Sequence, residues 1–460
     1  MGGLFSTLGT ASAALEVFSQ ALGVSQSNIA NVSTPGFAAQ RANILPIDTS
    51  GTGSSGGDFI TVSSSGDAFT DAVVQTASSH ASASQTQAAQ LSPINQLFDI
   101  TGSTGVLAAF QQFSTAFASL SVSPNDSVAG AAALTAASNV ASAFQTVAAG
   151  LDSQSTQVSS SVQSTTTQIN ALSATISQLN IQTISSPQPS PAIDANLRSS
   201  LDQLSTLIDI TVTTEPNGSV SVLAGGQLPL VLGDQSYALS ANVAAAPGAQ
   251  ISSAAGGNSP ASFSGQLGAL LQTQNGTIAQ LLGGNGQPGR LNTLAQGFAD
   301  LVNTALSSGT NAAGNPGVPI FTYNAANPAG TLAVDPTVTA NQLGLASATE
   351  SNGVANQLAA LPGSTAAAGQ IGGLSAEGLF SSIAALVGQQ LSDANTASTA
   401  DQTTLTTAQS NRQRQSGVSL DQEAVNITEY ERSYEASAKV VSILSQLTED
   451  AINIGTPSAG

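Results

Sequence analysis

Apolar residues recur at seven-residue spacing at both ends of the chain. In residues 4–32 the repeated positions are Leu8, Leu15, Leu22 and Ile29, with Phe18 on the same stripe. In residues 418–454 they are Leu420, Ile427, Tyr434 and Val441, and Leu444 continues the stripe. A seven-residue repeat places such side chains on one face of an α-helix, as in a coiled coil. We therefore predict an amphipathic helix at each end whose apolar face needs a partner.

The interior contains a longer helical pattern. Between residues 128 and 181 apolar residues step mostly by three and four, which predicts one continuous helix roughly 80 Å long. Shorter helical patterns begin near residue 104 and cover 194–208, 265–306 and 374–410. We expect the apolar side chains of 128–181 to form the core of an intramolecular helical bundle.

Strand patterns are confined to the middle of the chain. Residues 210–214 and 220–222 alternate apolar and polar on either side of Pro216-Asn217-Gly218, which predicts a β-hairpin. Residues 307–370 are rich in Gly and Asn, which is typical of loops. Residues 48–90 are rich in Gly, Ser and Thr with little periodicity, so we predict a flexible or weakly structured link there.

These patterns predict a mainly α protein with a small β-rich part. We expect an elongated multidomain molecule whose N- and C-terminal helices pair as a coiled-coil base, followed by a long helical bundle and a β-rich outer segment. The predicted division is a terminal assembly domain (1–47 and 411–460), a linker (48–90), a helical bundle (91–210 with 261–310 and 371–410) and an outer β-rich or loop segment (211–260 and 311–370).

The charge balance narrows the possible partners. Charged residues make up only 7% of the chain, with 26 acidic side chains against seven basic ones and a formal net charge of −19. No basic stripe is present that could neutralise phosphates, which argues against nucleic acid and anionic membranes as partners. A surface of small neutral polar groups costs little to desolvate, so it suits packing against further copies of the chain.

The chain contains no cysteine, and we expect no cleaved targeting signal. Without cysteine, disulfides, thiolate metal sites and thiol catalysis are excluded. The first basic residue is Arg41, so the N-terminus does not match a secretory signal peptide. No run reaches about 18 strongly apolar residues, and we predict no transmembrane helix. The chain is therefore expected either to stay in the cytoplasm or to be exported without signal cleavage.

Candidate chemistry is sparse. His80 lies in the Ser-rich 48–90 stretch, whereas a catalytic base needs a rigid scaffold, so we interpret it as a solvated histidine. Gly283–Gly289 lacks the Lys-Ser/Thr pair of a phosphate-binding loop. Four glutamates between 423 and 435 are interleaved with Arg432 and Lys439, which is typical of a solvated, partly paired helix face. We predict no catalytic residue, no cofactor and no metal.

Two stretches resemble known sequences. Asn28–Phe37, which reads Asn-Ile-Ala-Asn-Val-Ser-Thr-Pro-Gly-Phe, is similar to the N-terminal signature of bacterial flagellar rod, hook and hook-associated proteins. Ser416–Ala424, followed by Tyr434–Val440, resembles the C-terminal end of the family of flagellar hook-associated protein 1 (the FlgK family). The positions that carry the resemblance are Asn28, Asn31, Pro35, Gly36, Phe37, Gly417, Leu420, Asp421, Glu423 and Ala424.

The resemblance implies a structural subunit of the bacterial flagellum and not an enzyme. It implies export of the unfolded chain by the flagellar type III apparatus, followed by assembly into a ring at the distal end of the hook, outside the cell. The implied partners are further copies of the chain, the flagellar hook protein, the second hook–filament junction protein and a cytoplasmic export chaperone. The middle of the chain is short for this family, so an outer domain is expected to be reduced or missing.

The assembly residues are expected to be the two terminal stripes, which would order only when neighbouring subunits cover them. A hook or distal rod protein is the alternative within the same class, and the Leu420-Asp421-x-Glu423-Ala424 sequence argues against it. A secreted adhesin or glycan-binding protein is the alternative from another class. Glycan binding usually needs exposed aromatic side chains, and the chain has no Trp and four Tyr.

Overall fold

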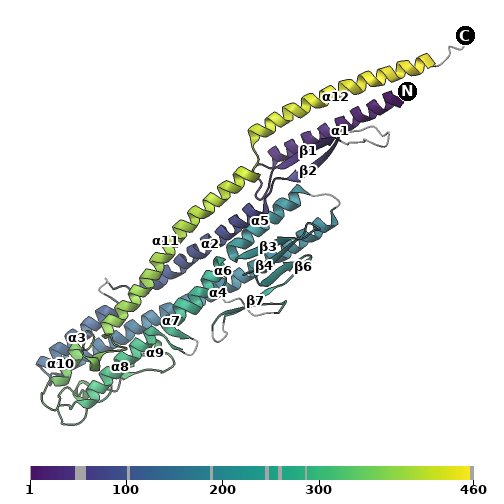
Figure 1. Cartoon of the computed structure of the whole chain (residues 1–460). Coiled ribbons are helices and arrows are strands. Elements are labelled where there is room, and N and C mark those ends of the chain that lie inside the picture. The colour runs from purple at the N-terminus through teal and green to yellow at the C-terminus, as the bar shows by residue number, and fades with distance from the viewer. Residues whose placement is uncertain are drawn as a thin grey trace.

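The molecule is a long rod, with both chain ends at the same extremity (Figure 1). The computed structural model describes residues 2–455 apart from 47–57, 101–103, 187–189, 244–247, 257–261 and 285–286. A terminal part contains α1 (Gly2–Ala30), the hairpin of β1 (Gln40–Pro46) and β2 (Asp58–Ser64), and α12 (Leu420–Gly455). A larger body contains all other elements, so the mainly α, elongated architecture predicted from the sequence is confirmed.

Long helices run through the body. They are α2 (Ala68–Leu97), α3 (Val106–Val122), α4 (Ser127–Ser185), α5 (Pro191–Leu207), α8 (Arg290–Ser308) and α11 (Ala376–Ser416). Shorter helices are α6 (Gly265–Gln272), a π-helix at Thr273–Ile278, α7 (Ala279–Leu282), α9 (Pro328–Thr331), α10 (Gly353–Ala360) and two 3₁₀ turns at Ala340–Gln342 and Ala367–Gly369. Asp67, Asp126 and Ser375 cap α2, α4 and α11 by accepting hydrogen bonds from backbone N–H groups of the first turn.

The β structure is small and antiparallel. A four-stranded sheet of β3 (Ile210–Thr214), β4 (Val220–Ala224), β5 (Leu228–Leu232) and β6 (Gln235–Ser236) packs on α4, beside the hairpin of β7 (Leu239–Asn242) and β8 (Gln250–Ser253). Two-residue strand pairs join β9 (Gly283–Gly284) with β10 (Gln287–Pro288) and β11 (Phe321–Thr322) with β12 (Ala333–Val334). The predicted hairpin at 210–222 corresponds to β3 and β4.

The core follows the 59-residue helix α4 along the body. Its inward stripe is buried, and Phe144 meets Phe110 with ring centroids 5.9 Å apart. Phe298 of α8 packs on the same ring of Phe110 at 4.8 Å and on Phe113 at 5.3 Å. By length and hydropathy α4 could also cross a membrane, but its large apolar side chains contact this core. The bundle predicted from the 128–181 pattern is therefore present.

Asparagine side chains attach the β segments to the helices. Asn180 is fully buried on α4, and its Nδ2 donates to the carbonyl oxygens of Val220 (2.7 Å) and Gly233 (2.6 Å) while its Oδ1 accepts from the N–H of Val220 (2.9 Å). Asn170 bonds both backbone groups of Leu239 in the same way. Each amide replaces the backbone partner that a neighbouring strand would supply, so the edge groups are satisfied inside the fold.

The structure corrects the predicted linker. Residues 58–64 form β2 and residues 68–97 form α2, whereas 48–57 lie outside the described residues. The helical period was hidden because the side of α2 that packs on α11 is built largely from small residues, such as Ala77, Ser78 and Ala81. Small side chains allow close approach of two helices without the large apolar residues that a sequence pattern detects.

The predicted outer segment is also not one unit. Residues 211–253 contain the strands that pack on the C-terminal part of α4, whereas 311–370 lie at the end of the body far from the termini, against α3, α8 and the N-terminal part of α4 (Figure 1). Buried side chains of Ile320, Phe321 and Leu332 join the latter stretch to the common core. Apolar side chains within a Gly- and Asn-rich sequence thus contribute to the bundle.

Candidate functional site

The two terminal helices pack against each other in antiparallel orientation. α1 runs from the free end of the rod towards the body, and α12 runs back to the same end (Figure 1). The β1–β2 hairpin packs on α1. The two helices cover part of each other within one chain, and the uncovered face of the pair remains available to a neighbour. That the terminal stripes order only when neighbouring subunits cover them stays a prediction.

The predicted stripe residues lie at the edges of this contact. Among the described residues of α1 and α12, the half-buried members are Leu8, Leu15, Phe18, Leu22, Ile29, Ile427, Val441 and Leu444. Leu420 is 52% exposed and Tyr434 is 44% exposed. The stripes thus contribute to the helix pair without being sealed inside it.

Sequence reasoning missed the most buried line of α1. Val17, Ala21, Ser25 and Asn28 are each at most 5% exposed. Two of the four are polar and one is alanine, so a search for large apolar residues passes over them. Their spacing of three and four residues is the signal that could have found them.

A second apolar line on α12 faces outward. Val425, Val440, Ile443 and Leu447 are between 47% and 60% exposed. The last three occupy one face, because they are separated by three and four residues. Single exposed apolar residues are common, but several on one face of a terminal helix mark an interaction site.

The two sequence motifs meet at the inner end of the helix pair. The Nδ2 of Asn28 donates to the Oε1 of Glu423 at 2.8 Å and to the carbonyl oxygen of Gln40 at 2.8 Å. The Oδ1 of Asn28 accepts from the N–H of Gln40, also at 2.8 Å. Asn28 is fully buried and Glu423 is 7% exposed. A residue of the N-terminal motif therefore contacts a residue of the C-terminal motif inside the same chain.

The turn after α1 docks on the body. Gly36 has φ +77°, and a Cβ at this position would lie 2.3 Å from the carbonyl oxygen of Ala195 in α5. Only glycine allows both that backbone conformation and that approach. Pro35 is exposed, Asn31 and Phe37 are half-buried, and the turn lines a cavity of about 190 Å³ between the terminal part and the body.

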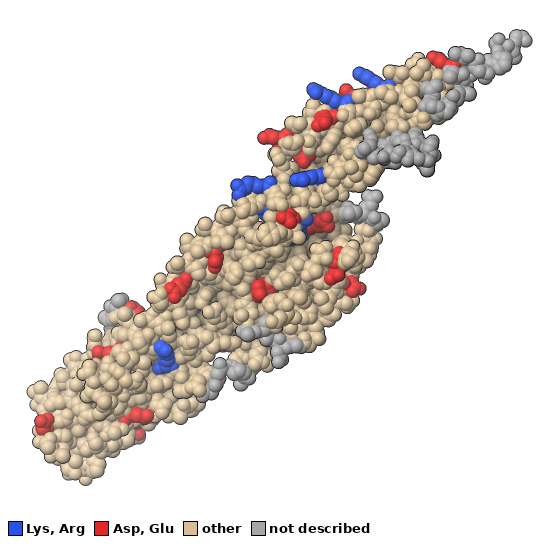
Figure 2. Space-filling view, in the orientation of Figure 1, with Lys and Arg blue, Asp and Glu red and all other residues tan. Residues whose placement is uncertain are grey.

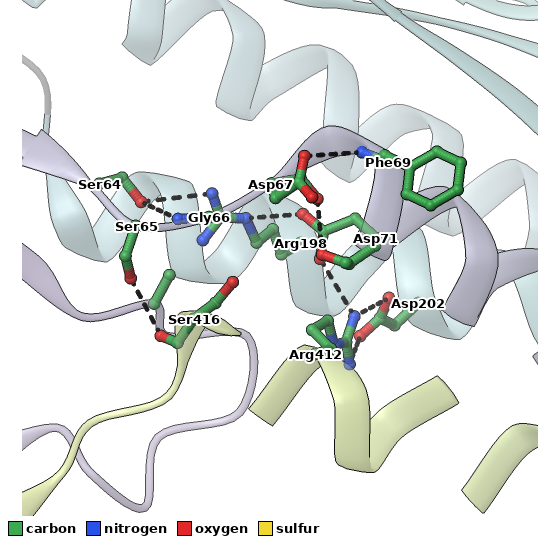
Figure 3. Close-up of polar contacts among 12 residues, drawn as sticks. Ser64, Ser65, Gly66, Asp67, Phe69, Asp71, Arg198, Asp202, Arg412 and Ser416 are labelled. Atoms are coloured by element: carbon green, nitrogen blue, oxygen red, sulfur yellow. Dashed lines mark hydrogen bonds and ion pairs between the residues drawn. The ribbon is translucent and has the colours of Figure 1, made fainter. Parts of the chain in front are cut away.

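The chain crosses between terminal part and body at 65–67 and at 417–419, and polar contacts tie these two crossings together (Figure 3). The carbonyl oxygen of Ser416 accepts from the N–H of Ala39 (2.8 Å) and from the Oγ of Ser65 (3.1 Å). The Nε2 of Gln415 donates to Asp67 at 2.9 Å. Gly417 is half-buried beside them, and Asp421 and Ala424 are exposed on the first turns of α12.

Four charged side chains link three helices at this joint (Figure 3). Asp71 of α2 pairs with Arg198 of α5 at 3.2 Å and with Arg412 of α11 at 3.4 Å. Arg412 also binds both carboxylate oxygens of Asp202, at 3.0 and 2.8 Å. Bidentate geometry fixes orientation as well as distance, so the network holds the end of α11 against α2 and α5.

Burial changes the titration of this network. Desolvation raises the pKa of Asp71 above its ordinary value of 3.8, although the charges of Arg198 and Arg412 act to lower it. The pKa of Arg412 lies above its ordinary value because Asp202 and Asp71 outweigh the effect of burial. Asp71 is therefore the carboxyl of the network whose pKa burial raises, so it holds a proton more readily than an exposed aspartate does.

Cations gather at this end of the molecule (Figure 2). Arg41 lies on β1, Arg198 lies at the joint and Arg290 lies on α8 in the body. The others are Arg412, Arg414, Arg432 and Lys439 on α11 and α12. Six of the seven basic residues therefore belong to the terminal part or the joint, and the body carries mostly acidic charge.

The described residues show no convergent catalytic chemistry. His80 is exposed on α2, so its predicted solvation agrees with the structure although its place in a linker does not. Within the described ranges no three His, Asp or Glu side chains gather as they would around a metal ion. The arrangement is suited to contacts between protein surfaces.

Comparisons with known proteins agree on a flagellar family. A family profile described as the flagellar hook-associated protein FlgK helical domain matches residues 91–321, which are 231 of the 460 residues. A second, described as the flagellar basal body rod FlgEFG protein C-terminal domain, matches residues 409–454. No curated protein matches the chain.

One similar solved structure is the flagellar hook junction protein FlgK from Burkholderia pseudomallei, with 26% sequence identity and a TM-score of 0.48. The match covers 55% of this chain and 46% of that chain. The helical-domain profile spans α3 to α8 and half of the sequence, and the rod-type profile covers α12. The chain belongs to the FlgK family of flagellar hook-associated proteins.

Proposed function

We propose that the chain is a structural, non-enzymatic subunit of the hook–filament junction that polymerises at the distal end of the hook through its terminal helices. The observation that carries this proposal is the outward apolar line of α12, Val425, Val440, Ile443 and Leu447, beside the half-buried stripes of the helix pair. Covering these side chains by neighbouring subunits removes apolar surface from water, which stabilises association.

The pairing of the termini supports a tube-forming base. Both helices point away from the body, so copies arranged side by side around an axis would bring their helix pairs together while the bodies face outward. The proposed neighbours are further copies of the chain in a ring, the hook protein on one side and the second junction protein on the other. We further propose that the chain is exported unfolded by the flagellar type III apparatus with a cytoplasmic chaperone on its C-terminal helix, and that it functions outside the cell.

The alternative of a hook or distal rod protein shares only the C-terminal profile, which is the rod-type one. The helical-domain profile of the hook-associated family favours the junction position. The alternative of a secreted adhesin has no comparable support, because both matching family profiles are flagellar.

The experiment is complementation of a deletion strain. Cells lacking the gene should carry hooks without filaments and release filament protein into the medium, and the full chain should restore filaments. The variant Val440→Ser, Ile443→Ser, Leu447→Ser should fail to restore them, because it removes the outward apolar face. The control Val122→Ser, Val128→Ser changes two residues that are 83% and 75% exposed at the other end of the rod, and it should restore filaments. Intact filaments in the deletion strain would refute the proposal.

A further inference from the structure

The apolar repeats leave the register of the helix pair weakly defined. Leu8, Leu15, Leu22 and Ile29 lie seven residues apart and are half-buried, and the half-buried Ile427 and Val441 of α12 lie 14 residues apart with the exposed Tyr434 midway between them. Sliding α12 along α1 by seven residues, roughly 10 Å, would therefore bring similar apolar side chains to the interface. In other registers the outward apolar line of α12 could also pack against α1. Hydrophobic burial alone does not select one register.

The contact between Asn28 and Glu423 exists in one register only. Seven residues before Asn28 the corresponding position is Ala21, and seven residues after Glu423 it is Tyr430. In a pair displaced by seven residues, Glu423 would face an alanine or lie beyond the end of α1. It would keep only the 3.4 Å contact from Asn426 of its own helix, and a buried carboxylate with so few donors is strongly unfavourable.

The amide of Asn28 is held in one orientation. Its Oδ1 accepts from the N–H of Gln40, and one hydrogen of its Nδ2 is donated to the carbonyl oxygen of the same residue. The remaining hydrogen of Nδ2 is therefore directed at α12, where it needs an acceptor, and the Oε1 of Glu423 lies 2.8 Å away. The Nδ2 of Asn426 approaches the other carboxylate oxygen at 3.4 Å. Gln40 of β1 thus fixes the direction of the Asn28 N–H, and α12 must place an acceptor there.

We propose that Asn28 and Glu423 set the register in which the two terminal helices pair. Buried polar residues in coiled coils select one alignment among several that apolar residues allow, at some cost in stability. The consequence for assembly, which rests on the proposed function, is that this pair decides which apolar residues of α12 face the neighbouring subunit.

Register is measurable because the chain contains no cysteine. Spin labels on Gln20→Cys and Glu449→Cys, both at exposed positions, report the axial offset of the helices by double electron–electron resonance on the full-length monomer. Gln20 lies eight residues before Asn28 and Glu449 lies 26 residues after Glu423, so the offset is 26 minus 8, or 18, residues, roughly 27 Å along the axis.

The wild-type background should give one narrow distance. The double variant Asn28→Leu, Glu423→Leu should keep its helices by circular dichroism, since apolar replacement of a buried polar pair is tolerated. It should show a second distance displaced by roughly 10 Å, the rise of seven residues. Glu423→Gln, which keeps an oxygen acceptor for Asn28, should give the single wild-type distance.

A matched control changes the same helices outside the contact. Gln26→Leu with Glu429→Leu replaces two exposed polar residues and should leave the single distance unchanged. One unchanged distance in the double-leucine variant would overturn the register proposal, and so would a broad distribution in the wild-type background. Neither result bears on the junction role, which the deletion strain tests separately.

Discussion

At the scale of single residues, the joint depends on a glycine that allows two backbones to touch. Gly36 combines a positive φ with a close approach to Ala195, whereas Gly233 has φ +57° and no atom within 4 Å of a built Cβ. Both positions disfavour a side chain for conformational reasons, and only the first also excludes it by contact. The Pro-Gly step of the N-terminal motif therefore has a structural role in seating the terminal part on α5.

Replacing Gly36 by Ala should lower the free energy of unfolding by about 2–5 kcal/mol, because a strained φ adds to a steric clash with backbone. Gly233→Ala is the control and should cost about 1 kcal/mol, the conformational part alone. Urea denaturation followed by circular dichroism measures both. Equal losses in the two variants would show that the docking of the turn on α5 contributes nothing.

The stability of the joint should depend on pH through Asp71. The pKa of Asp71 is raised in the folded state by burial, so the folded state binds its proton more tightly than the unfolded state does. Its contribution to stability is complete below the ordinary value of 3.8 and is lost as the pH rises through the folded-state pKa. Relative to Asp71→Asn, the wild type should therefore lose stability as the pH is raised from 3.8.

The measurement is the difference in unfolding free energy between wild type and Asp71→Asn across this pH range. Asn has the shape of the neutral aspartic acid, so the comparison reports on the charge of Asp71 beside Arg198 and Arg412. A wild type that gains stability over the variant with rising pH would show that the two arginines dominate over burial.

At the scale of elements, α2, α5 and α11 are joined by charge as well as by packing. Arg412→Met removes the bidentate contact with Asp202 and the contact with Asp71, leaving partly buried carboxylates with fewer donors. We expect a loss of about 1–3 kcal/mol, concentrated at the joint. Faster hydrogen exchange in residues 65–71 and 410–419 would report it.

The control for this change is Arg414→Met, two residues away. Arg414 is exposed and bonds only to Asn411 of its own helix among the described residues. Its loss should change stability by less than about 0.5 kcal/mol and leave exchange at the joint unchanged. If Arg412→Met behaved in the same way, the network would be dispensable for holding the joint.

Local periodicity revealed the helices that carry a regular stripe of large apolar side chains. α4 and α12 were predicted within a few residues of their ends, and so was the hairpin of β3 and β4. α2 was missed because its contact with α11 uses alanine and serine, which differ little from the residues of a polar linker. Small residues at helical spacing indicate a helix contact only when the partner helix is known.

Contacts between distant parts of the sequence could not be predicted. Asn28 and Glu423 are 395 positions apart, and Asp71 and Arg412 are 341 apart. The motifs contain Asn28 and Glu423, but the contact between these two residues forms only because the chain returns to its starting end. The resemblance to a family predicts which residues take part in assembly, and the structure shows what Asn28 and Glu423 touch within one chain.

At the scale of the whole molecule, the two ends of the rod differ in chemistry. The terminal part and joint hold six of the seven basic residues and the outward apolar line of α12. The body carries mostly acidic charge, has one large core and a small second cluster between α2 and α11, and is linked to the terminal part by two crossings. In such a molecule the terminal helices can pack against those of neighbouring copies without the body taking part in that contact.

The central claim is a position at the end of the hook, and immunogold labelling of isolated hook–basal bodies tests it most directly. Particles from cells producing the full chain with an epitope tag on the body should carry label in one cluster at the distal end of each hook. Label distributed along the hook, confined to the rod, or absent from the flagellum would contradict the account.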